Sequence, residues 1–259
     1  LFVTTGLQSS TATALMVTSF TAGGLVDLVP ALAVMLGANV GTTLIVQALA
    51  FDVYRIAPIL VLIGLLLFRW GRASRSRDLG RVSIGLGLML FALRELMMVA
   101  TSLDHTPTLR ILLDSIISDP LIAALLAAVL TWAAHASVVV VLLVMSFVAN
   151  GAIPLDVAFA FVLGANLGTS INPLLEAPTG GDGSARRVPV GNILGRLLGC
   201  AAALFFVDQI GPLISRLEPD PARVLADFHT AFNLLLALVF LPVLGPWARL
   251  LRRIVPGRM

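Results

Sequence analysis

Long apolar runs separated by short polar segments dominate the chain. They cover 28–50, 56–70, 82–100, 121–149, 157–175, 188–207 and 225–248. Several of these runs approach the roughly 20 residues that an α-helix needs to cross a bilayer. We therefore predict an all-α polytopic membrane protein.

Polar positions along these runs recur at a constant distance. The segment GANVGTT at 37–43 returns as GANLGTS at 164–170, which is 127 residues later, and SFTAGGLVDL at 19–28 pairs without a gap with SFVANGAIPL at 146–155. From Gln8 to Thr43, 16 of 36 aligned positions are identical, against roughly 3 or 4 expected by chance. The sequence therefore contains two copies of one unit.

Composition agrees with a membrane protein and gives its orientation. Hydrophobic residues make up 58% of the chain and charged residues 12%, with a mean hydropathy of +1.01. All basic residues are arginines, and they gather in short polar segments, as the positive-inside rule describes. We read the net charge of +3 as an orientation signal and expect no nucleic-acid partner. The segment that we place in the cytoplasm carries Arg69, Arg72, Arg75, Arg77 and Arg81.

The run 121–149 is too long for one ordinary span. If it forms a re-entrant hairpin, the chain returns outside near Asn150, and the next span brings Arg186 and Arg187 to the cytoplasm. A full crossing would leave both arginines outside, against the positive-inside rule. With the hairpin, the helices that carry GANVGTT and GANLGTS run in opposite directions. We therefore predict inverted-topology repeats, each with a re-entrant or broken-helix hairpin, an arrangement typical of secondary transporters.

This topology divides the chain into four parts. Residues 1–70 form repeat 1, and 71–120 hold the cytoplasmic Arg-rich loop, a connecting span and an outer loop. Residues 121–210 form repeat 2, and 211–259 hold an outer loop, the final span and a basic cytoplasmic tail. Because Leu1 already lies inside an apolar segment, we expect another span to precede it.

Polar side chains concentrate at two places in each repeat. The first is the hairpin tip, Gln8-Ser9-Ser10-Thr11 in one copy and His135-Ala136-Ser137 in the other; the second is the Gly-Ala-Asn-x-Gly-Thr segment. Two glycines around an asparagine weaken a helix, so we expect unwound backbone there whose N–H and C=O groups hold ions. The alternative is close helix packing through small residues, which we assign to Gly191, Gly195 and Gly199.

The polar segments favour a small anionic substrate. No acidic residue lies within either motif, which disfavours a cationic metal as cargo. Moving an anion into a negative cell costs about 2.3 kcal/mol per charge per 100 mV, so uptake requires co-transported cations. A channel and a receptor-like role stay open as alternatives. We predict no enzyme, because no nucleophile–base pair or paired histidine ligands occur within the apolar runs.

At these motifs the sequence resembles the type II sodium–phosphate cotransporter family. The matches are LQSSTAT at 7–13, the two Gly-Ala-Asn segments, ARRVPVGNILGRLLG at 185–199 and FHTAFNLLLALVFLP at 228–242. The resemblance implies sodium-coupled symport of inorganic phosphate by alternating access across a bacterial inner membrane, with a cytoplasmic C-terminus. It implies phosphate, sodium and the lipid bilayer as partners and no cofactor besides sodium as coupling ion, and it is compatible with a homodimer.

The resemblance also implies site residues. The substrate would contact Gln8, Ser9, Ser10, Thr11, His135, Ser137, Asn39 and Asn166. The sodium sites would use Gln8, Ser10, Thr42, Thr43, Ser137, Thr169, Ser170 and Asn172.

One departure from the family pattern lies at the second hairpin tip. The family carries Gln-Ser-Ser-Ser there, whereas this chain has His135-Ala136-Ser137. Imidazole titrates near neutral pH, so His135 could take up a proton in place of a cation. The alternatives are therefore a transporter of another small anion, proton coupling through His135, or a phosphate exporter. For Arg196, which lies among glycines in the run 188–207, we favour a role in helix packing over one in offsetting anion charge.

Overall fold

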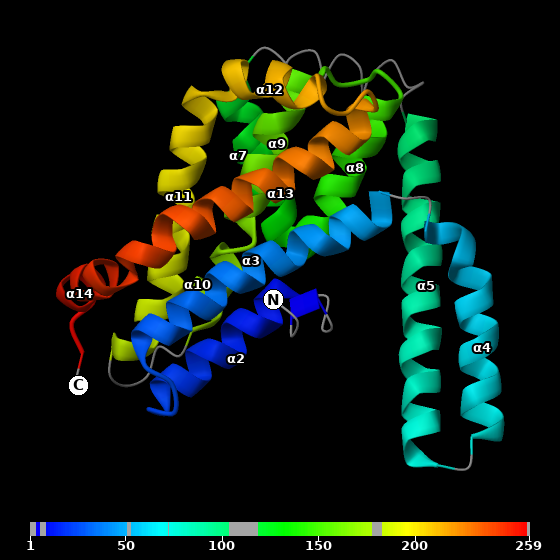
Figure 1. Ribbon diagram of the computed structural model, residues 1–259, viewed down its shortest axis with the longest axis horizontal. Helices are drawn as coiled ribbons and strands as arrows, with labels where there is room; N and C mark the ends of the chain where they lie inside the picture. Colours follow the sequence, from blue (N-terminus) through cyan, green and yellow to red (C-terminus); the bar gives the residue numbers. More distant parts are fainter. Residues whose placement is uncertain are drawn as a thin grey trace.

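The computed structural model describes residues 4–5, 9–50, 53–71, 73–103, 119–177 and 183–257. In these ranges all regular structure is helical (Figure 1). The elements are α2 Ser10–Ala22, α3 Leu28–Ala50, η1 Val53–Ile56, α4 Ala57–Trp70, α5 Ser74–Leu103, α7 Pro120–Ala134, α8 Ser137–Ala149, α9 Leu155–Gly168, α10 Ile171–Glu176, η2 Gly183–Arg186, α11 Arg187–Phe205, α12 Val207–Ser215, α13 Pro221–Phe240, η3 Leu241–Val243 and α14 Leu244–Ile254.

Four helical segments among the described residues are long and apolar enough to cross a membrane. They are Leu28–Ala50, Leu155–Glu176, Gly183–Phe205 and Pro221–Ile254. These segments coincide with four of the apolar runs, 28–50, 157–175, 188–207 and 225–248. The predicted fold class, an all-α polytopic membrane protein, is confirmed.

The run 121–149 forms two helices rather than one. Helix α7 has 15 residues and α8 has 13, so they are about 23 Å and about 20 Å long, short of the roughly 30 Å hydrocarbon core. The chain reverses at His135, which has a left-handed φ of 56°, and at the extended Ala136. The hairpin expected here is therefore present.

The sequence repeat is also a structural repeat. Helices α2 and α8 both have 13 residues, and their bounds differ by 127 at either end. Their N-caps have nearly the same backbone angles, φ −143° and ψ 109° at Ser9 and φ −148° and ψ 105° at Ala136. Both helices end in a turn with a glycine at φ 70°, Gly24 or Gly151. Helices α3 and α9 then begin at equivalent positions, Leu28 and Leu155.

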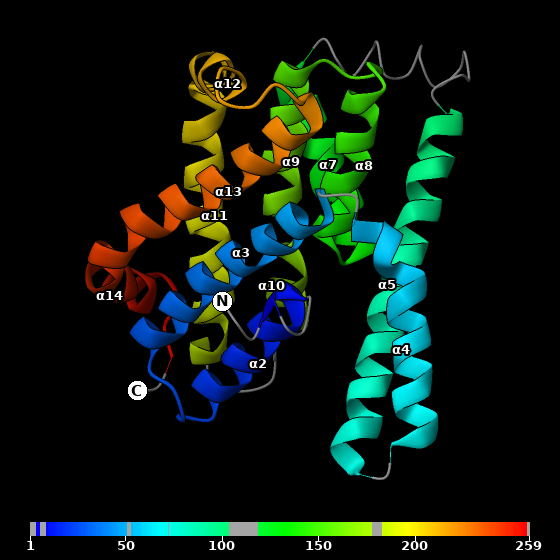
Figure 2. The same cartoon turned by 45° about the vertical axis from the view of Figure 1, so that its right-hand side comes forward.

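The two copies run in different directions through the molecule. In Figures 1 and 2, α3 climbs from the lower left, whereas α9 descends from the top. Helices α8, α9 and α13 share one apolar core, in which the rings of Phe159 and Phe228 lie 4.5 Å apart. Helices α2, α3, α11 and α14 share a second core, which includes Leu32, Val188 and Leu251.

Helices α4 and α5 form a pair beside this bundle (Figure 1). Helix α5 begins at Ser74, so Arg75, Arg77 and Arg81 are helical and do not belong to the loop expected at the start of 71–120. Arginine is a good helix former, and the Arg81–Asp78 ion pair of 3.0 Å supports the added turns. Arg72 and residues 104–118 of the expected outer loop lie outside the described residues. Helix α12 extends into the other expected outer loop, which we placed from 211 onward.

Candidate functional site

Arg196 of α11 lies where the two repeated motifs meet. Its side chain is buried, with 3% exposed. Nη1 donates to the main-chain oxygen of Asn166 and to Thr169 Oγ1, the latter at 2.7 Å. Nη2 donates to Asn39 Oδ1. One guanidinium group therefore joins GANVGTT on α3 to GANLGTS on α9, using the fork of donors that distinguishes arginine from lysine.

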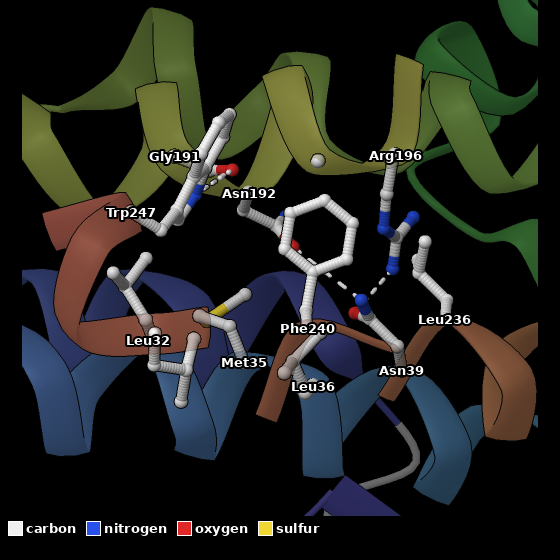
Figure 3. Close-up of a pocket in the computed structure, with 12 residues that line it drawn as sticks. Leu32, Met35, Leu36, Asn39, Gly191, Asn192, Arg196, Leu236, Phe240 and Trp247 are labelled. Atoms are coloured by element: carbon white, nitrogen blue, oxygen red, sulfur yellow. Dashed lines mark hydrogen bonds between the residues drawn. The ribbon is translucent and has the colours of Figure 1, made fainter. Parts of the chain in front are cut away.

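Three further asparagine contacts surround this centre. Asn39 Nδ2 donates to Asn192 Oδ1 at 3.4 Å, and Figure 3 shows Asn192 beside Arg196 on α11. Residues four apart share one face of a helix, which explains why both reach Asn39. On the other side, Asn233 Nδ2 of α13 donates to Asn166 Oδ1 at 3.0 Å. Asn166 Nδ2 donates to Val162 O at 3.0 Å within its own helix.

The positive charge of Arg196 has no carboxylate partner among the described residues. Among the described residues, only neutral oxygen atoms accept hydrogen bonds from Arg196. Three buried polar atoms there have no partner within the described part of the chain, Arg196 Nε, His229 Nδ1 and Asn233 Oδ1. A buried unpaired charge is costly, so the centre favours a small anion that accepts hydrogen bonds.

A small cavity lies against this centre. Its volume is about 20 Å³, and Asn39, Asn192 and Arg196 form its polar wall. Phe240 and Trp247 contribute to the apolar part of the lining (Figure 3). Such a volume holds about one water molecule. An anion larger than water therefore needs α3 to move away from α11, α13 or α14.

The hairpin-tip residues begin the repeated helices. Ser9 Oγ accepts a hydrogen bond from Ala12 N at 3.1 Å and so caps α2. Ser10 and Thr11 are buried in its first turn, and Ser137 is buried at the first position of α8. Thr11 Oγ1 has no hydrogen-bond partner within the described ranges. Gln8 lies outside the described residues.

His135 is exposed and contacts α10 and its own hairpin. Its side chain is 59% exposed, and Nε2 lies 3.6 Å from Glu176 Oε1 on α10. Nδ1 lies 3.3 Å from the main-chain oxygen of Ala133. Asn172, also on α10, donates from Nδ2 to Trp132 O at 3.2 Å. The second tip is thus joined to α10, and proton coupling through His135 stays a prediction.

The hydroxyl groups of the Gly-Ala-Asn segments bond mainly to their own helices. Thr42 donates to Ala38 O at 3.1 Å and Thr43 to Val40 O at 2.9 Å. Such bonds satisfy a hydroxyl without opening the helix, and α3 continues without a break from Leu28 to Ala50. The expected unwinding of 37–43 is therefore wrong. In the second copy the chain does break, but only after Gly168, where Thr169 and Ser170 separate α9 from α10.

The glycines of the second motif serve helix packing. A Cβ atom on Gly164 would lie 2.0 Å from Ala124 O, and one on Gly168 would lie 2.4 Å from Ala128 O. These glycines let α9 approach the backbone of α7, as small residues do between membrane helices. Gly191 serves packing too, as expected, because its Cβ would meet Leu32 and Leu251. Gly164 and Gly168 themselves are helical, so the unwinding expected over 164–170 is present only at its last two residues, Thr169 and Ser170.

The structure brings together only part of the predicted site. Asn39, Asn166 and Thr169 meet at Arg196, whereas the sequence analysis assigned Arg196 to packing and gave Asn233 no role. The available signal was one ionisable residue inside a membrane span, which is by default a functional candidate.

Comparison with known proteins identifies the family of the chain. The family model described as Na+/Pi-cotransporter matches residues 1–99 and 95–213. The "Putative inorganic phosphate export protein YjbB" of Escherichia coli K12 is 38% identical over 253 residues, which are 98% of this chain and 46% of that protein. The "Uncharacterized protein YqeW" of Bacillus subtilis is 32% identical over 97% of this chain and 81% of its own length.

The chain thus spans about half the length of the first of these relatives, 46%. No solved structure matches the chain. The two stretches that match the family model, 1–99 and 95–213, together cover most of the 259 residues. The chain therefore belongs to the Na+/Pi-cotransporter family.

Proposed function

We propose that this chain is a secondary transporter that moves inorganic phosphate across a bacterial inner membrane by alternating access, with sodium as the coupling ion. The observation that carries the proposal is the buried Arg196, which joins both repeated motifs and has only neutral acceptors among the described residues. Phosphate offers several oxygen acceptors, which match the donors of a guanidinium group.

The repeat arrangement supports alternating access. Two copies of one unit that cross the bilayer in opposite senses build a site at their interface, where either copy can rock against the other. Arg196 contacts Asn39 from the first copy and Asn166 and Thr169 from the second. When the copies separate, Arg196 loses part of these contacts, and phosphate oxygens replace them.

Oxygen-bearing side chains near the tips support sodium as the coupling ion. Hard cations take oxygen ligands, and the buried hydroxyl groups of Ser10, Thr11 and Ser137 supply oxygens at the starts of α2 and α8. Phosphate uptake into a negative cell costs about 2.3 kcal/mol per charge per 100 mV. Bound sodium offsets this charge and couples uptake to the sodium gradient.

Export is a second candidate direction. The printed name of the Escherichia coli relative describes phosphate export, and the membrane potential favours outward movement of an anion. The same site serves both directions, since alternating access is reversible.

Proteoliposomes that contain the full chain test the proposal. We expect entry of labelled phosphate to rise when a sodium gradient replaces a potassium gradient of equal size. Removing the charge in Arg196→Gln costs about 2–5 kcal/mol of anion binding, which is roughly thirtyfold or more in affinity. Arg253→Gln, at an exposed position of α14, is the matched control. Equal phosphate movement by Arg196→Gln and wild type would exclude the proposed site. Release of phosphate from the proteoliposomes at a rate that does not depend on sodium would support the export direction.

A further inference from the structure

A second cavity is separate from the one at the Arg196 centre and lies at the end of the bundle where α14 is found. It is a cleft of about 510 Å³ between the α2–α3 turn, η2, the start of α11 and α14. These segments lie together at the lower left of Figure 1. We infer that this cleft binds a phosphate group through Arg187 and Arg252.

Charge in the cleft favours an anion. Among the described residues that line it, two are arginines, Arg187 and Arg252, and one is an acid, Asp27. Arg187 is held in place, because its Nε donates to Val255 O at 3.0 Å and its Nη2 donates to Gly257 O at 2.9 Å. A guanidinium group fixed in this way binds an anion with little further loss of side-chain freedom. Arg252 is exposed on α14 and completes the positive wall.

Two helix N-termini open on the same cleft. Leu28 begins α3 and Arg187 begins α11, and both residues line the cavity. The helical segment that contains α11 begins at Gly183, because η2 leads directly into it, and Ser184 of η2 also lines the cavity. The first N–H groups of a helix and its dipole attract anions, and Asp27 offsets this field only at α3. A negatively charged ligand is therefore favoured both by the arginines of the cleft and by the α11 terminus.

The cleft lies on the same helix as the proposed transport site. Arg187 and Arg196 are nine residues apart on α11, which corresponds to about 14 Å along the helix. Gly191 lies between the two arginines on α11, and Leu32 lies on α3 between Leu28 at the cleft and Asn39 at the centre. Both residues line the small cavity next to Arg196. If the proposed function holds, the cleft is the inner vestibule from which phosphate reaches Arg196. The phosphate group comes either from free inorganic phosphate or from the headgroup of an anionic lipid.

Thiol labelling tests the cleft without requiring transport. Ser184 lines it, so Ser184→Cys in the purified full chain reports on access, and wild type gives the background from the buried Cys200. The measured quantity is the labelling rate of an anionic thiosulfonate reagent divided by that of a cationic one. We expect this ratio to be about ten times larger at Ser184→Cys than for a free thiol in solution. Arg252→Gln should remove most of this preference, whereas Arg253→Gln, which does not line the cleft, should keep it.

Two arms identify the source of the phosphate group. In phospholipid-free detergent, millimolar inorganic phosphate should slow labelling in the Arg253→Gln background and not in Arg252→Gln. In nanodiscs, phosphatidylglycerol in place of phosphatidylcholine should slow labelling without added phosphate if a lipid headgroup is the ligand. Equal rates for both reagents, together with no protection by phosphate or phosphatidylglycerol, would overturn the site. A failed transport assay with intact protection would reject the proposed function and leave the cleft in place.

Discussion

Arg196 is held by oxygen atoms that carry no full charge. They belong to the side chain of Asn39, the main chain of Asn166 and the hydroxyl of Thr169. Such acceptors position a guanidinium group without neutralising it, and its charge stays available to a ligand. A carboxylate at one of these positions would make a stronger pair and would remove that charge. This difference separates a binding role of Arg196 from a purely structural one.

We predict that Asn39→Asp keeps the fold and loses transport. Its carboxylate accepts from Arg196 Nη2 in place of the amide oxygen and pairs a buried charge that is costly when unpaired. The bond that Asn39 Nδ2 donates to Asn192 Oδ1 is lost, but the Asn192 amide can turn and donate from Nδ2 to the second carboxylate oxygen. The melting temperature should therefore stay or rise. A negative charge next to the anion costs several kcal/mol, so phosphate movement in proteoliposomes should fall roughly tenfold or more.

The control for this prediction is Asn39→Ala. It removes the acceptor for Arg196 and the donor to Asn192, so we expect a lower melting temperature, unlike that of Asn39→Asp. If Asn39→Asp moved phosphate at the wild-type rate, Arg196 would not be the partner of the anion.

Sequence reasoning found the repeated half of this centre and missed the rest. Asn39, Asn166 and Thr169 stand out because each lies in a motif that recurs 127 residues away. Arg196 and Asn233 lie beyond 135–170, the part of the second copy that aligns with 8–43, and neither belongs to a recurring motif. Their contacts with Asn166 span 30 and 67 residues. Only the packing of α11 and α13 against α9 brings them together.

Helix bounds were predictable where a local sequence signal occurs in both copies. The prediction was wrong where contacts between helices decide whether a segment stays helical. The bounds of α2 and α8 keep the 127-residue offset, because the same N-cap backbone angles and the same turn with a glycine at φ 70° recur in both copies. The Gly-Ala-Asn segments were expected to unwind, since glycine weakens an isolated helix. Instead, Gly164 and Gly168 lie against α7, and this close contact stabilises the helix that contains them.

We predict that Gly164→Ala destabilises the protein. The added Cβ would lie 2.0 Å from Ala124 O, which is backbone and must move, and overpacking of this kind costs about 1–3 kcal/mol. Gly85→Ala on α5 is the matched control, because among the described residues nothing lies within 4 Å of its Cβ. Thermal unfolding in detergent should show a clear loss for Gly164→Ala and none for Gly85→Ala. Equal melting temperatures would contradict the close approach of α7 and α9.

The repeated turns give a paired prediction. Gly24 and Gly151 both have φ 70°, and a Cβ on either would meet nothing within 4 Å. Alanine there suffers backbone strain alone, about 1 kcal/mol. We expect Gly24→Ala and Gly151→Ala to lower the free energy of unfolding equally. Gly245→Ala, which also has free space but no positive φ, should be neutral. A large effect in only one repeat would show that the two turns differ.

The two spaces along α3 and α11 differ greatly in size. The cavity there, about 20 Å³, holds about one water molecule, whereas the cleft beside Arg187 has about 510 Å³. A phosphate ion therefore fits the cleft but not the centre. Helices α3 and α11 both line each of these spaces. Relative movement of these two helices is the simplest way to connect the spaces.

A cross-link between α3 and α11 tests this movement, and we predict that it stops transport. A Cβ atom at Gly191 would lie 2.8 Å from Leu32 Cδ2, so cysteines at both positions are close enough for oxidative or short bifunctional cross-linking. The linked Leu32→Cys/Gly191→Cys protein should lose most phosphate movement in proteoliposomes, and cleavage of the link should restore it. Each single-cysteine variant, treated identically, shows what the substitutions alone do. Full transport by the linked protein would mean that phosphate passes without separation of α3 from α11, and the alternating movement would then have to lie between other helices.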